Sequence, residues 1–300
     1  MTASNLSQTE AKGRMASDLV GKVFLVTGAT EGIGKAAALE FARRGATMTL
    51  VARSKEKGER VVAELIAQSG NPKLDLLLGD LSKLSDVRAL AAAFKGQHDR
   101  LDVLVNNAGA LFRTKQFSAD GYEMTFALNH LAYFALTTEL LDLLQKTPGA
   151  RVVSTSSGSH MTGKIDFADI AKRPSGRLGF AAYGDSKLAN ILFTRELARK
   201  LAPFGGTANC FHPGFVRTAF GQNNPDFVAT AIRIAGSLFA RTPEKGAETL
   251  VWLATSPAAA ALNGQYCQDK KVAWSTARAK DDALAEKLWQ FSLDLCTAGA

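Results

Sequence analysis

Cysteine is scarce in this chain, and so are the patterns in which cysteine and histidine bind metals. The 300 residues include three cysteines, Cys210, Cys267 and Cys296, which lie far apart and form no C-x-x-C pair. An odd number of isolated cysteines argues against a disulfide framework and for a reducing compartment. The four histidines also lack metal-ligand spacing. We therefore expect no metal site and a cytoplasmic protein.

Long apolar segments and runs of a single charge are also missing. Residues 1–20 are polar and of mixed charge, so we expect a flexible N-terminal tail, with neither a signal peptide nor a membrane span. Lys and Arg number 36 against 28 Asp and Glu, a formal charge of +8, yet no run of five or more basic residues occurs. Basic residues scattered over a solvated surface account for this excess, and nucleic-acid binding is not indicated.

The chain does contain a repeated alternation of short apolar runs and amphipathic stretches. The runs predict strands at 22–27, 47–52, 73–80, 101–109, 150–157 and 206–214, and helices follow the first five at 33–45, 54–70, 82–96, 121–146 and 181–203. Successive strands joined through helices form a parallel sheet, whose ligands bind at the carboxyl ends of the strands. Further helices are expected at 242–256 and 281–296, with a seventh strand at 264–268.

The predicted fold class is therefore α/β. We expect one doubly wound Rossmann-fold domain over residues 21–300, with a parallel sheet of about seven strands. A hydrophobic content of 46% is sufficient for a buried core in a domain of this size.

A glycine-rich segment, "VTGATEGIG" at 26–34, joins the first strand to the first helix. Glycines permit a tight bend and a close approach of the backbone to a phosphate. The P-loop spacing is absent, because five residues separate Gly28 from Gly34 and Ala36 follows Lys35. The G-x-G-x-x-G spacing is absent too, and on this stretch alone an ordinary strand–helix turn remains open.

The spacing T-G-x-x-x-G-x-G resembles the short-chain dehydrogenase/reductase family. The segments "NNAG" (106–109), "YGDSK" (183–187) and "HPG" (212–214) follow in that family's order, and the resemblance covers roughly residues 21 to 270. "SKLANILFTRELARKL" (186–201) and "HPGFVRT" (212–218) are similar to retinol-dehydrogenase-like members. The resemblance implies an NAD(P)-dependent oxidoreductase that interconverts an alcohol and an aldehyde or ketone by hydride transfer.

Candidate catalytic residues follow from the second of these segments. Tyr183 and Lys187 are one helical turn apart, so they share a face, and an ammonium near a phenol lowers the phenol pKa and makes it a usable acid–base group. An isolated Y-x-x-x-K pair is more often a core tyrosine with a snorkelling lysine, so the pair carries this function only together with the other segments. The resemblance adds Ser157, with Ser156 as the second choice, to orient the reacting oxygen, and Asn129 to support a water relay to Lys187.

The cofactor residues are also implied by the resemblance. They are Thr27, Gly28, Thr30, Glu31, Gly32, Ile33, Gly34, Arg53, Ser54, Asp80, Leu81, Asn106, Asn107, Ala108, Gly109, Tyr183, Lys187, Pro213, Gly214, Val216 and Thr218. The end of the second strand carries Arg53 and Ser54 and no acid, which favours the 2′-phosphate of NADP(H) over NAD(H). Glu31 argues the other way, because it stands where some NADP-using members carry a basic residue.

The expected partner is a small carbonyl or alcohol substrate. A capping segment at about 215–240 mixes apolar and polar residues without a charged anchor, which favours an apolar substrate. A homo-oligomer is possible, since the family often pairs through the helices that carry Asn129 and the Tyr183–Lys187 pair. The alternative function is a catalytically silent NADP(H)-sensing protein, against which the full set of Asn129, Ser157, Tyr183 and Lys187 argues.

Overall fold

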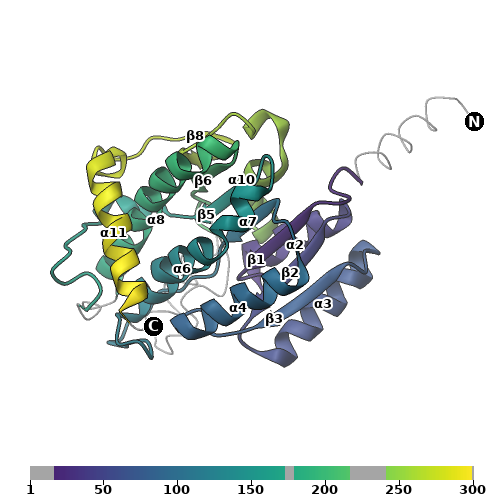
Figure 1. Ribbon diagram of the computed structural model, residues 1–300, viewed down its shortest axis with the longest axis horizontal. Coiled ribbons are helices and arrows are strands. Elements are labelled where there is room, and N and C mark those ends of the chain that lie inside the picture. Colours follow the sequence, from purple (N-terminus) through teal and green to yellow (C-terminus); the bar gives the residue numbers. More distant parts are fainter. Residues whose placement is uncertain (1–16, 173–178, 217–240, 299–300) are drawn as a thin grey trace, which may run out of the picture.

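The computed structural model describes residues 17–172, 179–216 and 241–298, and within them the strands form one sheet (Figure 1). The strand order is β3-β2-β1-β4-β5-β6-β7-β8. The strands are β1 Val23–Thr27, β2 Thr47–Ala52, β3 Leu74–Leu78, β4 Val103–Asn106, β5 Arg151–Thr155, β6 Thr207–Phe211, β7 Tyr266–Gln268 and β8 Lys271–Val272. The order reverses between β1 and β4, so a crevice opens at the carboxyl ends of these two strands. The α/β Rossmann prediction is confirmed.

The sheet differs from the prediction at one edge. Its first seven strands are parallel, as predicted, but β8 pairs antiparallel with β7. The two-residue turn between them holds Asp269 and Lys270 at φ 51° and 58°, which matches the hairpin turns that suit the twist of paired strands. A strand of two exposed residues shows no alternation of apolar and polar side chains, so periodicity could not predict it.

Helices cover both faces of the sheet (Figure 1). Helices α2 (Gly32–Arg43), α3 (Lys55–Ser69) and α10 (Pro243–Thr255) pack on one face, in a core that includes Phe24 and Val26 of β1. The other face is covered by α4 (Leu84–Gln97), α6 (Ala132–Glu139), α7 (Leu141–Lys146) and α8 (Phe180–Leu201). The core on that face includes Leu25 of β1, which stands between Phe24 and Val26 in the sequence. Alternate residues of β1 thus enter opposite cores, as its unbroken apolar sequence predicts.

A last helix, α11 (Asp282–Thr297), lies outside this second layer and packs on α8 and α6. Its Trp289 ring lies 4.9 Å from Phe134 of α6 and 5.9 Å from Phe193 of α8. Short 3-10 segments are η2 Gly158–Thr162, η3 Ala202–Phe204, η4 Pro257–Ala259 and η5 Arg278–Lys280. Helices α6 and α8 therefore lie between the sheet and α11.

The single helix predicted at 121–146 is wrong. The chain forms α5 (Met124–Phe126), a π-helical segment η1 (Ala127–Leu131), α6 and then α7, with a break at Leu140. Asn129 lies in the π-helical segment, and such segments occur frequently at functional sites. One π turn barely changes the spacing of apolar side chains, so the sequence still has the periodicity of a continuous helix.

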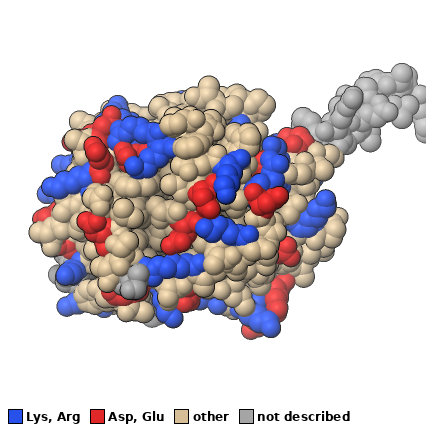
Figure 2. Space-filling view, in the orientation of Figure 1, with Lys and Arg blue, Asp and Glu red and all other residues tan. Residues whose placement is uncertain are grey.

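The surface and termini bear on the remaining expectations. Lys and Arg side chains are interspersed with Asp and Glu over the face shown in Figure 2. In the described part of the chain no helix has both the length and the apolar character needed to cross a membrane. The predicted tail lies almost wholly outside the described residues, as do Thr218 and most of the predicted capping segment.

Candidate active site

The glycine turn after β1 packs directly on the segment after β4. Gly28 and Gly32 have φ of 65° and 55°, in the left-handed region that favours glycine. A Cβ on Gly28 would lie 2.7 Å from Ala108 Cα, and one on Gly34 would lie 2.2 Å from the Gly28 carbonyl oxygen. Both contacts are shorter than real Cβ atoms show, so this turn requires glycine at 28 and 34.

The start of α2 fits an anionic cofactor group. Glu31 is the N-cap residue, and within the described chain its side chain makes no capping hydrogen bond. The first turn of α2 has no acidic residue, so its amides and the positive end of the helix dipole are suited to a phosphate. The Glu31 carboxylate instead forms an ion pair with Lys57 of α3. The turn can therefore hold the pyrophosphate of a dinucleotide.

Side chains at the ends of β1 and β5 and directly after β4 tie the strand ends together. Thr27 Oγ1 donates to the Val105 carbonyl (3.1 Å) and accepts from the Asn107 amide (2.9 Å). Asn107 Nδ2 donates to the Gly28 carbonyl (3.1 Å), and its Oδ1 accepts from Thr155 Oγ1 (3.1 Å). The side chains of Thr27 and Asn107 therefore hold the glycine turn in place.

Asn106 faces the interior of the protein. Its side chain is fully buried and donates to Thr137 Oγ1 at 3.0 Å. Any contact of Asn106 with the cofactor would therefore have to come from its backbone and not from its side chain. Neighbouring side chains along a strand point to opposite faces, and the doublet of asparagines alone did not show which one faced inward.

Tyr183 and Lys187 lie on α8, as predicted, with the Lys187 ammonium 5.4 Å from the centre of the Tyr183 ring. Lys187 is 2% exposed, and its Nζ donates to the Thr155 carbonyl at 3.1 Å. Burial lowers the Lys187 pKa from 10.5 to about 7. Burial also raises the Tyr183 pKa to about 12, although a hydrogen bond with the Ser157 side chain lowers it.

These pKa directions differ from the expectation that Lys187 lowers the Tyr183 pKa. The ammonium lies over the face of the phenol ring and bonds to Thr155. Removal from water is then the largest influence on the pKa of both groups, because it disfavours the phenolate and the ammonium alike. Tyr183 consequently keeps its proton throughout the neutral range.

The geometry distinguishes the two candidate serines. Ser156 Oγ donates to the Lys187 backbone carbonyl at 2.8 Å and is 1% exposed. Ser157 pairs with Tyr183, and its own carbonyl accepts a hydrogen bond from His160 Nδ1 at 2.8 Å. The structure thus brings Ser157, the first choice from the sequence, next to Tyr183.

Asn129 is fully buried beside this pair. Its side chain accepts from the Ala110 amide (2.9 Å) and donates to the Ala110 carbonyl (3.0 Å). A Cβ on Gly109 would lie 2.9 Å from Asn129 Oδ1 and 3.7 Å from Lys187 Nζ. Asn129 therefore fixes the loop after β4 next to the lysine.

Sequence reasoning missed Asn190, although it lies within the quoted segment 186–201. Asn190 Nδ2 donates to the backbone carbonyls of Asn129 (2.9 Å) and Thr155 (3.1 Å). Its position three residues after Lys187 on one helix puts both side chains on the same face. That spacing was the available indication.

The other predicted cofactor residues lie around the same edge of the sheet. Gly214 has φ 81°, and a Cβ there would lie 2.8 Å from Arg241 Nε. Ile33 and Val216 both approach Gly246 of α10, at 3.2 and 2.7 Å from the position of a Cβ on that glycine. The remaining positions are Thr30 and Pro213, which are half-buried, Arg53 and Ser54, which are exposed, Asp80, whose carboxylate accepts from Ser82, and Leu81, which is buried.

Comparisons with known proteins decide the family. The family model for short chain dehydrogenases matches residues 22–228. This chain belongs to the short-chain dehydrogenase family. The short-chain dehydrogenase described here is 40% identical over 277 residues to retinol dehydrogenase 12 of Bos taurus, an alignment that covers 92% of this chain and 87% of the relative. The predicted resemblance to retinol dehydrogenases is confirmed.

Solved structures agree with this assignment. An uncharacterized protein of Mycobacterium paratuberculosis has a TM-score of 0.74 and 29% identity, covering 94% of this chain and 95% of that one. The Pseudomonas aeruginosa protein RhlG, solved as an NADP complex, has a TM-score of 0.67 and 28% identity, covering 84% and 95%. This short-chain dehydrogenase is therefore an NAD(P)-dependent oxidoreductase that interconverts alcohols and carbonyl compounds.

Proposed function

We propose that this enzyme reduces an apolar aldehyde or ketone with NADPH, using Tyr183 as the proton donor. The observation that carries the proposal is the pairing of Tyr183 with Ser157 beside Lys187, at the carboxyl ends of β4 and β5. The nicotinamide, when bound, supplies a hydride to the carbonyl carbon. Ser157 orients the carbonyl oxygen, and Tyr183 gives that oxygen its proton, which completes the alcohol.

The protonation state of Tyr183 supports its assignment as the proton donor in carbonyl reduction. With a pKa of about 12, the phenol holds its proton at neutral pH and can donate it. Oxidation requires the phenolate as acceptor, which burial disfavours. Lys187 lies beside the Tyr183 ring, and we expect its side chain to bind a ribose hydroxyl of the cofactor.

The start of α3 supports NADP(H). Arg53 follows β2 directly and is exposed, and Ser54 is the N-cap of α3, so a guanidinium, a hydroxyl and a helix start converge there. The ion pair with Lys57 neutralises Glu31, the residue that argued against a 2′-phosphate. Because a 2′-phosphate carries charge, we expect Arg53→Glu to lower the kcat/KM ratio of NADPH to NADH at least tenfold. Arg60→Glu, an exposed change farther along α3, is the matched control.

The apolar substrate class is supported by exposed apolar side chains in three segments that adjoin site residues in the sequence. Met161, Phe180 and Phe215 are 55%, 49% and 59% exposed. Along the chain they follow Ser157, precede Tyr183 and follow Gly214 respectively. A relative at 40% identity is named a retinol dehydrogenase, which agrees with an apolar ligand.

The test follows nucleotide absorbance with purified protein, NADPH or NADH, and a panel of apolar aldehydes, ketones and quinones. Tyr183→Phe keeps the ring and removes the proton, so we expect kcat to fall about 10²- to 10⁴-fold while NADPH binding is retained. Turnover that survives in Tyr183→Phe would refute the proposed proton donor. Nucleotide binding without turnover in the wild type would favour the NADP(H)-sensing alternative.

A further inference from the structure

A continuous line of buried polar groups crosses the layer between α11 and the active site. Ser292 Oγ of α11 lies 2.9 Å from His130 Nε2, and His130 Nδ1 lies 3.3 Å from Asn190 Oδ1. Asn190 then reaches the carbonyls of Asn129 and Thr155. Ser292, His130 and Asn190 are all fully buried, so each depends on the others for hydrogen bonds.

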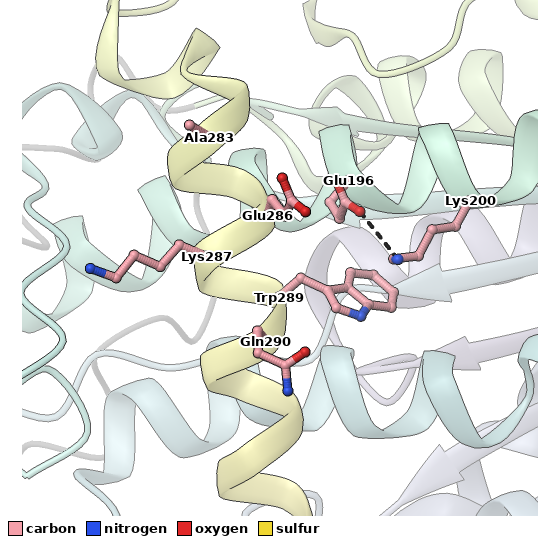
Figure 3. A pocket seen from close by; sticks show the side chains of 7 residues that line it. All are labelled: Glu196, Lys200, Ala283, Glu286, Lys287, Trp289 and Gln290. Carbon is pink, nitrogen blue, oxygen red and sulfur yellow. Dashed lines mark ion pairs between the residues drawn. The ribbon is translucent and has the colours of Figure 1, made fainter.

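Helix α11, which carries Ser292, also packs against α8 at the protein surface. Figure 3 shows Trp289 of α11 beside Lys200 and Glu196 of α8, in an open depression of about 400 Å³. The Lys200 ammonium lies 4.8 Å from the Trp289 ring and pairs with Glu196 at 3.2 Å. The Lys200–Trp289 contact joins α11 to α8, and the ion pair with Glu196, within α8, positions the ammonium for it.

The direction of every hydrogen bond between Ser292 and Asn190 follows from the contacts of Asn190, the residue nearest the active site. The Asn190 side chain faces two carbonyl oxygens, which only its NH₂ group can satisfy. Its Oδ1 therefore faces His130 and accepts from an Nδ1–H. His130 Nε2 is then an acceptor, and the Ser292 hydroxyl must donate to it. Burial among Phe126, Phe134 and Phe193 lowers the His130 pKa to about 4, so the ring stays neutral at physiological pH.

Asn190 and the catalytic Lys187 share one hydrogen-bond acceptor. The Thr155 carbonyl accepts from both Asn190 Nδ2 (3.1 Å) and Lys187 Nζ (3.1 Å). The second carbonyl belongs to Asn129, in the π-helical segment whose side chain holds the loop after β4. A shift of Asn190 would therefore change the acceptor that sets the position of the ammonium.

We propose that Ser292, His130 and Asn190 are positioning residues through which the C-terminal helix places Lys187 and the Asn129 segment for catalysis. The catalytic consequence rests on the proposed function, whereas the hydrogen-bond directions and the link to Lys187 do not. The inference therefore makes the last helix, remote from the glycine turn, part of what sets turnover.

Nuclear magnetic resonance of the ligand-free protein tests the line without any assay of turnover. We expect His130 in the Nδ1–H tautomer, and a mixture of tautomers in Ser292→Ala. In Asn190→Leu the Thr155 carbonyl serves the ammonium alone, so the Lys187 pKa, followed by its Cε resonance, should rise by about half a pH unit or more. An Nε2–H tautomer in the wild type, or a Lys187 titration unchanged in Asn190→Leu, would overturn the inference.

Kinetics test the catalytic consequence. We expect kcat to fall about tenfold or more in Asn190→Leu and about threefold or more in Ser292→Ala, with KM for NADPH changed less than about threefold. Ser292→Thr keeps the hydroxyl and should restore turnover. Thr147→Val is the matched control, because it removes a buried hydroxyl that bonds Leu101 and Leu143 away from this line; it should lower the melting temperature and leave kcat unchanged.

The two hypotheses fail in different ways. Variants that lose thermal stability but keep wild-type kcat would show a merely structural network and refute the positioning role. A wild type with no turnover on any carbonyl substrate would refute the proposed function, and the tautomer and the Lys187 titration would still decide the hydrogen-bonded line.

Discussion

We expect Lys187→Met to make the folded protein more stable while it removes turnover. Lys187 is 2% exposed, and burial lowers its pKa from 10.5 to about 7. Below pH 7 the lysine is charged in both folded and unfolded chains, so the folded state bears the whole penalty of burying the charge. Between pH 7 and 10.5 the unfolded chain binds more protons, so the penalty declines as pH rises and vanishes above 10.5.

The size of the effect follows from these two pKa values. At about 1.4 kcal/mol per pH unit, the interval from 10.5 to about 7 gives a penalty of about 5 kcal/mol at pH 6 and about 2 kcal/mol at pH 9. Methionine has a similar length and no charge, so it removes this penalty. The stability gained by Lys187→Met should therefore be about 3 kcal/mol larger at pH 6 than at pH 9.

Urea denaturation of both proteins at the two pH values measures this difference directly. The difference between pH values is the informative quantity, because the folded and unfolded pKa values of Lys187 determine it whatever the loss of the Lys187–Thr155 hydrogen bond costs at either pH. Lys200→Met, a change at a side chain 36% exposed on the same helix, is the control and should show no such gain. Equal stabilisation by Lys187→Met at pH 6 and pH 9 would refute the argument that the buried ammonium is the source.

Two further predictions follow from the glycine turn and the cysteines. Gly34→Ala puts a Cβ 2.2 Å from the Gly28 carbonyl oxygen, so it should weaken NADPH binding at least tenfold in a titration. Gly96→Ala is the control, because Gly96 lies in α4 with no described atom within 4 Å of a Cβ there. It should bind NADPH normally and gain up to about 1 kcal/mol of stability. All three cysteines are free and buried, and burial raises the pKa of Cys267 and Cys296 to about 12 and that of Cys210 further. Native protein should therefore react with a thiol reagent far more slowly than unfolded protein. Fast labelling of the native protein would contradict this burial.

The sheet could be predicted from the sequence because its strands are buried on both faces. The unbroken apolar runs around Val26 and Val105 lack the polar face of an amphipathic helix or of a half-exposed strand, so they indicate strands covered on both sides. The details that escaped prediction are set by neighbours in space. The antiparallel β8 depends on a turn at Asp269 and Lys270, and the π-helical segment at Asn129 depends on its contacts with Ala110 and Asn190.

In the active site, too, features set by the local sequence could be predicted and features set by neighbours in space could not. Spacing along one helix predicted that Tyr183 and Lys187 share a face, because helical geometry alone requires it. The raised Tyr183 pKa and the lowered Lys187 pKa could not be predicted, because both depend on how completely water is removed. His130 and Ser292, 162 residues apart, gave no local indication that they meet.

The position of α11 gives the order of synthesis a physical consequence. This helix supplies partners of His130, Phe134 and Phe193, yet it follows α6 and α8 in the sequence and is therefore synthesised after them. Until it emerges, the nascent chain exposes an aromatic surface on α6 and α8 and a histidine without its serine. A message that ends before α11 would therefore yield a chain prone to aggregation, even though Tyr183, Lys187 and the glycine turn had all been made.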